Sequence, residues 1–143
     1  MGTKVHQKED VTVLVVEDND IDVMGIQRAF SRAELSNPVV IARNGVEALD
    51  KLRDGASVPK PYMILLDLNM PRMNGIEFLH ETRNDPALKS SIVFVLTTSK
   101  DQSDKSKAYE HNVAGYIVKE RGNSEFIDAA ELLNYYTRVV EFP

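Results

Sequence analysis

Five short runs of apolar, largely β-branched residues are spaced along the chain and separated by longer amphipathic segments. These runs occupy residues 11–16, 39–42, 63–66, 92–96 and 113–118, and Gly115 interrupts the last of them. Short continuous apolar runs are typical of strands that are buried on both faces of a sheet. The pattern therefore predicts five strands.

The segments between the runs carry apolar residues at helical spacing. We expect helices over residues 21–35, from residue 44 onward, and over residues 75–83, 101–111 and 123–140. Asn44 and Glu47 have the spacing of a capping box at a helix start. The segment 101–111 has little to anchor it besides Ala108 and Tyr109. This alternation predicts an α/β fold with a parallel sheet covered by helices on both faces.

Length and composition limit the classes of protein to consider. With 143 residues, 43% of them hydrophobic, we expect one domain over residues 11–143, a polar lead-in over residues 1–10, and no separate output domain. The absence of cysteine excludes disulfides, thiolate zinc sites and cysteine nucleophiles. A net charge of −5, without a lysine or arginine run, argues against nucleic-acid binding. No apolar stretch approaches the roughly 20 residues of a membrane span. We expect a cytoplasmic protein, with which the lack of cysteine is consistent.

Polar residues follow four of the predicted strands, at the edge where parallel sheets bind ligands. They are Glu17 and Asp18 after the first strand, Asp67 after the third, Thr97 after the fourth and Lys119 after the fifth. Two carboxylates about 4 Å apart repel by ~4 kcal/mol at an effective dielectric near 20, so three converging carboxylates favour a bound cation. Mg²⁺ suits such oxygen ligands and leaves room for phosphate. The hydroxyl of Thr97 and the charge of Lys119 suit a transferring phosphoryl group.

Each of these residues also has a simpler interpretation when it is considered alone. Glu17 and Asp18 fit a solvated strand end with an aspartate at a helix N-cap. Asp67 fits a turn, and lysines such as Lys119 mostly lie on the surface. The joint appearance of these residues, each directly after its own strand, favours a functional site.

Four segments, VLVVEDND, ILLDLNMPRMNGIEFL, VFVLTTS and GYIVK, together resemble the receiver domain of bacterial response regulators. The resemblance runs from about Val11 to the C-terminus. It implies a flavodoxin-like (βα)5 fold with strand order 2-1-3-4-5. It also implies a non-enzymatic two-component switch, to which a sensor histidine kinase or a phosphotransfer protein donates the phosphoryl group.

The resemblance assigns a role to each site residue. Asp67 would be the phosphoacceptor, Asp18 and Glu17 would hold Mg²⁺ directly and through water, and the backbone carbonyl of Asn69 would complete the metal site. Thr97 and Lys119 would contact the phosphoryl oxygens, and Tyr116 would be the aromatic switch. Ser99 and Asn69 occupy positions that tune the dephosphorylation rate in the family.

Three features depart from the common family pattern. Asn74 replaces an aspartate that is usually not catalytic. Glu120 replaces a proline, so we expect a trans peptide and a different loop over residues 120–123. The TTS run, the missing proline and the aromatic-rich C-terminus resemble the small regulators that are paired with bacteriophytochromes.

Two other functions are compatible with parts of the pattern. A Mg²⁺-dependent phosphohydrolase of the haloacid-dehalogenase type would place an acid two residues after its nucleophile, where this chain has Asn69. A receiver-fold module that binds partners without phosphorylation is the other alternative, although all five site residues are present. A dinucleotide-binding module is excluded, because no glycine-rich phosphate loop follows the first strand.

The predicted last helix has two apolar stripes. Phe126, Ala129, Ala130, Leu133, Tyr136 and Val140 form the first stripe, which can dock on the sheet. Leu132, Tyr135, Val139 and Phe142 form the second stripe. We expect this second stripe to mediate a homodimer. The alternative is that the helix ends early and the tail folds back over its own core.

Overall fold

The computed structural model describes residues 10–119 and 125–143 and confirms the predicted alternation of strands and helices. The strands are β1 (Thr12–Val16), β2 (Val39–Ala42), β3 (Tyr62–Leu66), β4 (Ile92–Thr97) and β5 (Gly115–Val118). The helices are α1 (Asp20–Arg32), α2 (Gly45–Arg53), α3 (Gly75–Asn84), α4 (Gln102–Glu110) and α5 (Glu125–Val139). The expected lead-in lies outside the described residues except for Asp10, and the loop over residues 120–123 lies wholly outside them.

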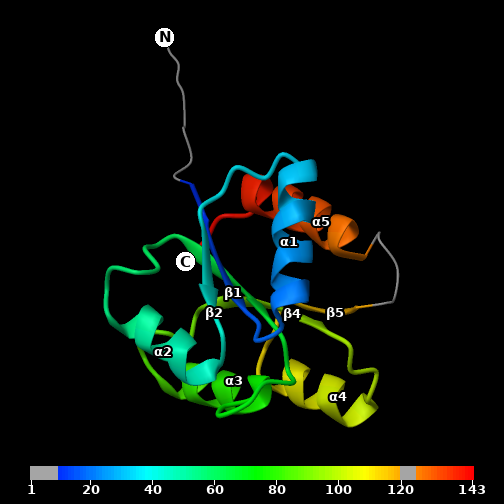
Figure 1. Cartoon of the computed structure of the whole chain (residues 1–143). Helices are drawn as coiled ribbons and strands as arrows, with labels where there is room; N and C mark the ends of the chain where they lie inside the picture. The colour runs from blue at the N-terminus through cyan, green and yellow to red at the C-terminus, as the bar shows by residue number, and fades with distance from the viewer. Residues whose placement is uncertain (1–9, 120–124) are drawn as a thin grey trace.

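The strands form one parallel sheet in the order β2-β1-β3-β4-β5, as the family resemblance implies. Figure 1 shows α1 and α5 on one face of the sheet and α2, α3 and α4 on the other. Alternate residues of the central strands point to opposite faces. Val13 and Val15 therefore join the core under α1 and α5, whereas Leu14 and Val16 join the core under α2 and α3.

Burial separates the central strands from the edge strands. Every residue of β1 and β3 is buried, as the apolar runs predicted. The prediction of complete burial was wrong for residues 39–42, because β2 is an edge strand and three of its four residues are only half-buried. The strand predicted over residues 113–118 is shorter, since β5 begins at Gly115, and all four of its residues are half-buried.

Polar side chains fix where the helices begin. Asn19 caps α1 by accepting the N–H of Asp22 at 3.0 Å, so the helix begins one residue earlier than predicted. The capping box predicted at Asn44 and Glu47 is only half formed. Asn44 accepts the N–H of Glu47 at 2.9 Å, but the Glu47 carboxylate accepts the N–H of Arg43 instead of that of Asn44.

The reciprocal capping box is at the start of α3. The Asn74 side chain accepts the N–H of Glu77 at 2.9 Å, and the Glu77 carboxylate accepts the N–H of Asn74 at 3.0 Å. An aspartate at this position would supply the same acceptor. The departure at Asn74 from the family pattern therefore preserves the helix cap.

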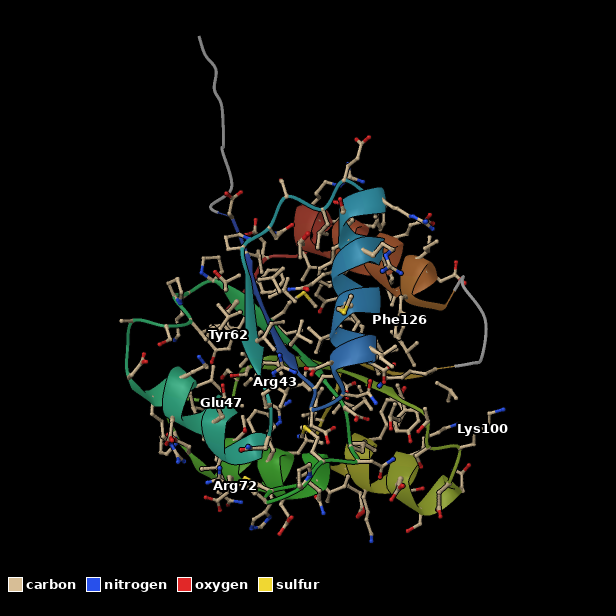
Figure 2. All side chains as sticks on the ribbon, in the orientation of Figure 1. Arg43, Glu47, Tyr62, Arg72, Lys100 and Phe126 are labelled. Atoms are coloured by element: carbon tan, nitrogen blue, oxygen red, sulfur yellow. The ribbon has the colours of Figure 1, made fainter. Side chains whose placement is uncertain are left out.

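The last two helices differ in how they are anchored. Within α4 only Ala108 is buried, and the Tyr109 side chain is 46% exposed, so Tyr109 does not provide the second anchor that we considered. At the start of α5, the Phe126 ring lies against α1 (Figure 2), where a Cβ added to Gly25 would be 2.8 Å from the ring.

No helix in residues 10–119 and 125–143 has the length and apolar character to cross a membrane.

The C-terminal tail corrects one part of the two-stripe prediction for α5. Phe142 was assigned to the exposed stripe, but its ring packs edge-on against Tyr136 with 5.8 Å between the ring centroids. The tail beyond Val139 is not helical, so the helical phase that placed Phe142 on the outer stripe no longer applies there. Leu132, Tyr135 and Val139 remain exposed.

Arg83, near the end of α3, forms hydrogen bonds with both turns that lead into β4 and β5. Its guanidinium donates to the backbone carbonyls of Lys89 and Ser91 at 2.8 Å each, of His111 at 2.6 Å and of Asn112 at 3.1 Å. The planar five-donor guanidinium can serve several carbonyls at once. This network fixes the amino ends of the two strands, opposite the predicted site.

We expect Arg83→Met to lower the free energy of unfolding by about 2 kcal/mol, because carbonyls that the guanidinium satisfies would lose their donor. Urea unfolding would measure the change. The matched control is Arg53→Met, which removes a more exposed guanidinium that pairs with Asp85 and should change stability by less than about 1 kcal/mol. Equal effects of the two substitutions would contradict a special role for Arg83.

Candidate functional site

Backbone hydrogen bonds extend beyond the strand ends into the predicted site residues. The N–H of Asp67 donates to the carbonyl of Val16 at 3.0 Å, and the N–H of Glu17 donates to the carbonyl of Ala42 at 2.9 Å. The N–H of Lys119 donates to the carbonyl of Thr97 at 2.7 Å. The parallel pairing of the strands therefore fixes these residues at one edge of the sheet.

Glu17, Asp18 and Asp67 converge as predicted, with one carboxylate oxygen from each lying within 4.8 Å of the others. Glu17 and Asp67 are buried, at 2% and 7% exposure, whereas Asp18 is open to solvent. Buried carboxylates at this separation repel one another unless a cation neutralises them. A hard divalent cation with oxygen ligands fits this donor set, and the open side at Asp18 leaves room for water and phosphate oxygens.

Lys119 supplies a positive charge beside these carboxylates. Its side chain is buried, and its Nζ lies 2.5 Å from Oε1 of Glu17 and 3.0 Å from Oδ2 of Asp22. Burial raises the pKa of Glu17 to about 7; the hydrogen bond from Lys119 opposes this rise and the charge of Asp67 adds to it. Burial disfavours the ammonium form of Lys119, but the bond to Glu17 and the charge of Asp67 outweigh burial and raise the pKa of Lys119.

Asp22 belongs to the site but was not predicted from the sequence. Its position four residues after Asp18, in the first turn of α1, was the signal available. In a chain with 22 acidic residues, that spacing alone could not distinguish Asp22 from a solvated helix residue.

Thr97 and Tyr116 are connected through Ser99. Thr97 is fully buried, and its hydroxyl oxygen accepts the N–H of Ser99 at 3.3 Å. The Tyr116 hydroxyl donates to the Ser99 carbonyl at 2.9 Å, and burial is the main cause of the raised pKa of Tyr116. The Ser99 hydroxyl donates to Oδ2 of Asp104 at 2.7 Å, which connects this loop to α4.

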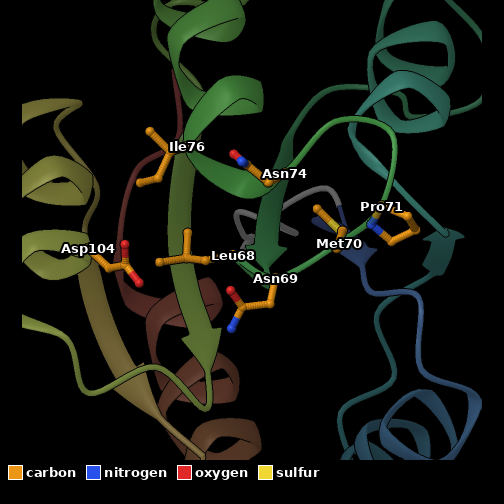
Figure 3. A pocket seen from close by; sticks show the side chains of 7 residues that line it. All are labelled: Leu68, Asn69, Met70, Pro71, Asn74, Ile76 and Asp104. Atoms are coloured by element: carbon orange, nitrogen blue, oxygen red, sulfur yellow. The ribbon is translucent and has the colours of Figure 1, made fainter.

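The loop between β3 and α3 passes close to Asp67 because residue 75 is glycine. A Cβ added to Gly75 would lie 2.7 Å from the backbone oxygen of Asp67, and the Gly75 N–H donates to the carbonyl of Leu68 at 3.0 Å. Asn69 is exposed at the edge of a pocket of about 420 Å³ beside the site (Figure 3). The lining residues are Leu68, Asn69, Met70, Pro71, Asn74, Ile76 and Asp104.

Comparisons with known proteins identify the family of this chain. The model of the response regulator receiver domain matches residues 13–131. The response regulator Rcp1 of Synechocystis sp. is 31% identical over 135 residues, which is 92% of this chain and 92% of Rcp1. The probable methanogenesis regulatory protein FilR2 of Methanothrix harundinacea is 36% identical over 120 residues, or 82% of this chain and 77% of FilR2.

Two solved structures have the same fold over most of their length. The phosphorylated cyanobacterial phytochrome response regulator RcpA has a TM-score of 0.84 at 33% identity, over 94% of this chain and 99% of RcpA. The Mn²⁺-bound form of Rcp1 has a TM-score of 0.82 at 31% identity, over 93% of this chain and 99% of Rcp1. With the family model covering most of the sequence, the chain belongs to the receiver-domain response regulators of two-component signalling.

Proposed function

We propose that the protein is a phosphorylation switch in which Asp67 accepts a phosphoryl group in the presence of Mg²⁺. Glu17, Asp18 and the backbone carbonyl of Asn69 would hold the ion together with Asp67. The observation that carries the proposal is the convergence of three carboxylates with Lys119 beside them at one edge of the sheet. The donor would be a histidine kinase or a phosphotransfer protein, and the likeness to phytochrome response regulators makes a phytochrome-type kinase the first to test.

In the proposed transfer, a carboxylate oxygen of Asp67 forms a bond to phosphorus as the bond between phosphorus and the donor breaks. Mg²⁺ would reduce the repulsion between this carboxylate and the phosphoryl oxygens. Lys119 and Thr97 would stabilise charge on those oxygens. Asn69 stands where a phosphohydrolase of the haloacid-dehalogenase type has its acid, which favours a switch over hydrolysis of other phosphate esters.

We expect acetyl phosphate to add one phosphoryl group to the wild type when Mg²⁺ is present and none when EDTA removes it. Asp67→Asn should remain unmodified, because the amide is not a nucleophile at this site. Intact-mass spectrometry would measure the modification. A phosphoryl group retained on Asp67→Asn would disprove the assignment, and a wild type that no donor modifies would favour a partner-binding module.

The contacts around Ser99 suggest how phosphorylation would change the surface. We infer that the phosphoryl group draws in the Thr97 hydroxyl, which frees space for the Tyr116 ring to turn inward. That rotation would break the bond between the Tyr116 hydroxyl and the Ser99 carbonyl. Helix α4 would then shift, because only Ala108 anchors it in the core and Asp104 connects it to Ser99.

Phosphorylation should therefore change hydrogen exchange across residues 101–118 in the wild type. Thr97→Ala should still accept phosphate but lose most of that change, because the hydroxyl that senses the phosphoryl group is missing. Hydrogen-exchange mass spectrometry with and without beryllofluoride would measure both effects. Thr98→Ala is the matched control, and its hydrogen exchange should respond to phosphorylation as that of the wild type does. Exchange that stays constant in the wild type would contradict the proposed switch.

Helix α5 presents a surface suited to a second copy of the chain. The side chains of Leu132, Tyr135 and Val139 are 43%, 61% and 57% exposed. Tyrosine offers a large contact area while its hydroxyl stays hydrated. We propose that this surface forms a homodimer, in which Phe142 would have no direct part because it packs on Tyr136 of its own chain.

We expect the wild type to sediment as a dimer at micromolar concentration and Leu132→Glu, Tyr135→Glu to sediment as a monomer. Burying two carboxylates from each protomer in an apolar interface is unfavourable. The matched control is Ile21→Glu, Met24→Glu, which adds the same charges to exposed apolar positions on α1. Sedimentation velocity would decide, and a wild type that stays monomeric at high micromolar concentration, with and without beryllofluoride, would rule out the dimer.

A further inference from the structure

Lys119 forms ion pairs with two residues that follow β1. Its Nζ lies 2.5 Å from Oε1 of Glu17, the residue directly after the strand, and 3.0 Å from Oδ2 of Asp22, in the first turn of α1. The backbone of Asp22 is itself fixed, because its N–H donates to the capping side chain of Asn19. Asp22 therefore presents its carboxylate to the ammonium from a capped helix end.

The ammonium needs such fixing because lysine is a point charge on a flexible four-carbon chain. Within the described part of the chain, the ion pairs of Lys119 are those with Glu17 and Asp22. These pairs occupy two of the three N–H donors. The third donor remains available for an oxygen placed on Asp67, the carboxylate whose charge also raises the pKa of Lys119.

We propose that Asp22 is a positioning residue that orients Lys119 toward the phosphoryl group. The inference rests on the proposed phosphorylation of Asp67. Glu17 would serve both the ion and Lys119, so a bound cation would weaken its hold on the ammonium. Asp22 has no place in the carboxylate cluster that would hold the ion and would keep its bond to Lys119 throughout the transfer.

A purely electrostatic effect of Asp22 predicts the opposite result from positioning. Removing a negative charge near an anionic phosphoryl donor would speed the reaction. Releasing the Lys119 ammonium would slow it, because a misplaced charge stabilises the transferring phosphoryl group less well. The direction of the rate change therefore separates the two roles.

The test measures the rate constant for phosphorylation of Asp67 by acetyl phosphate at saturating Mg²⁺. We expect Asp22→Ala to be slower by about three- to tenfold. Asp22→Asn should recover part of the rate, because its amide oxygen still accepts a hydrogen bond. Asp20→Ala is the matched control: Asp20 lies in the same helical turn and pairs with Arg43 instead of Lys119, so this variant should not be slower than wild type.

Three further measurements separate positioning from a loss of folding. In a Lys119→Ala background, Asp22→Ala should cause no additional decrease, since the residue that it positions is missing. In the metal-free wild type, the ammonium protons of Lys119 should give an NMR signal protected from exchange, and Asp22→Ala should weaken that protection. Thermal unfolding of each variant would confirm that the fold is retained.

An Asp22→Ala rate equal to or faster than that of wild type would overturn the inference. So would an equal decrease in the presence and absence of Lys119, because the effect would then not act through the lysine. A wild type that accepts no phosphate would instead contradict the proposed function. The NMR measurement on metal-free protein would still show whether Asp22 holds the ammonium.

Discussion

The pairing of β1 with β3 is the constraint on which the site depends. Val16 stands opposite Leu66, and the next residues continue the ladder, since the N–H of Asp67 donates to the carbonyl of Val16. A slip of one residue would move the apolar side chains of the slipped strand from the core on one face of the sheet to the differently packed core on the other face, so the two cores fix this register. The approach of Asp67 to Glu17 is therefore a direct result of hydrophobic packing several residues away.

The strands and helices of the sheet region are anchored to different extents. The amino ends of β4 and β5 are fixed through Arg83, whereas α4 is fixed in the core only by Ala108. Because α4 has few buried apolar contacts, the free energy needed for its local movement is low. A small displacement at Thr97 can thus reach α4 through Ser99 without disturbing the strands that hold the carboxylates.

Much of the fold and the proximity of the site residues could be predicted from the sequence, because both follow from local apolar runs and from the polar residues that end them. The burial of β2 was overestimated, since an apolar run does not show whether its strand lies at an edge. The contact of Asp22 with Lys119 joins residues 97 positions apart and depends on how α1 sits on the sheet. The direction of the Phe142 ring likewise depends on a tail that leaves the helical phase.

The hydrogen bonds of Arg83 also bear on how the sequence can diverge. Its acceptors are backbone carbonyls, which every amino acid provides, so a changed side chain at position 89, 91, 111 or 112 does not remove an acceptor from the network. Substitution at those positions requires no compensating change at Arg83. Covariation between aligned sequences would therefore miss this contact, and the arginine would stand out only as an invariant position without a coupled partner.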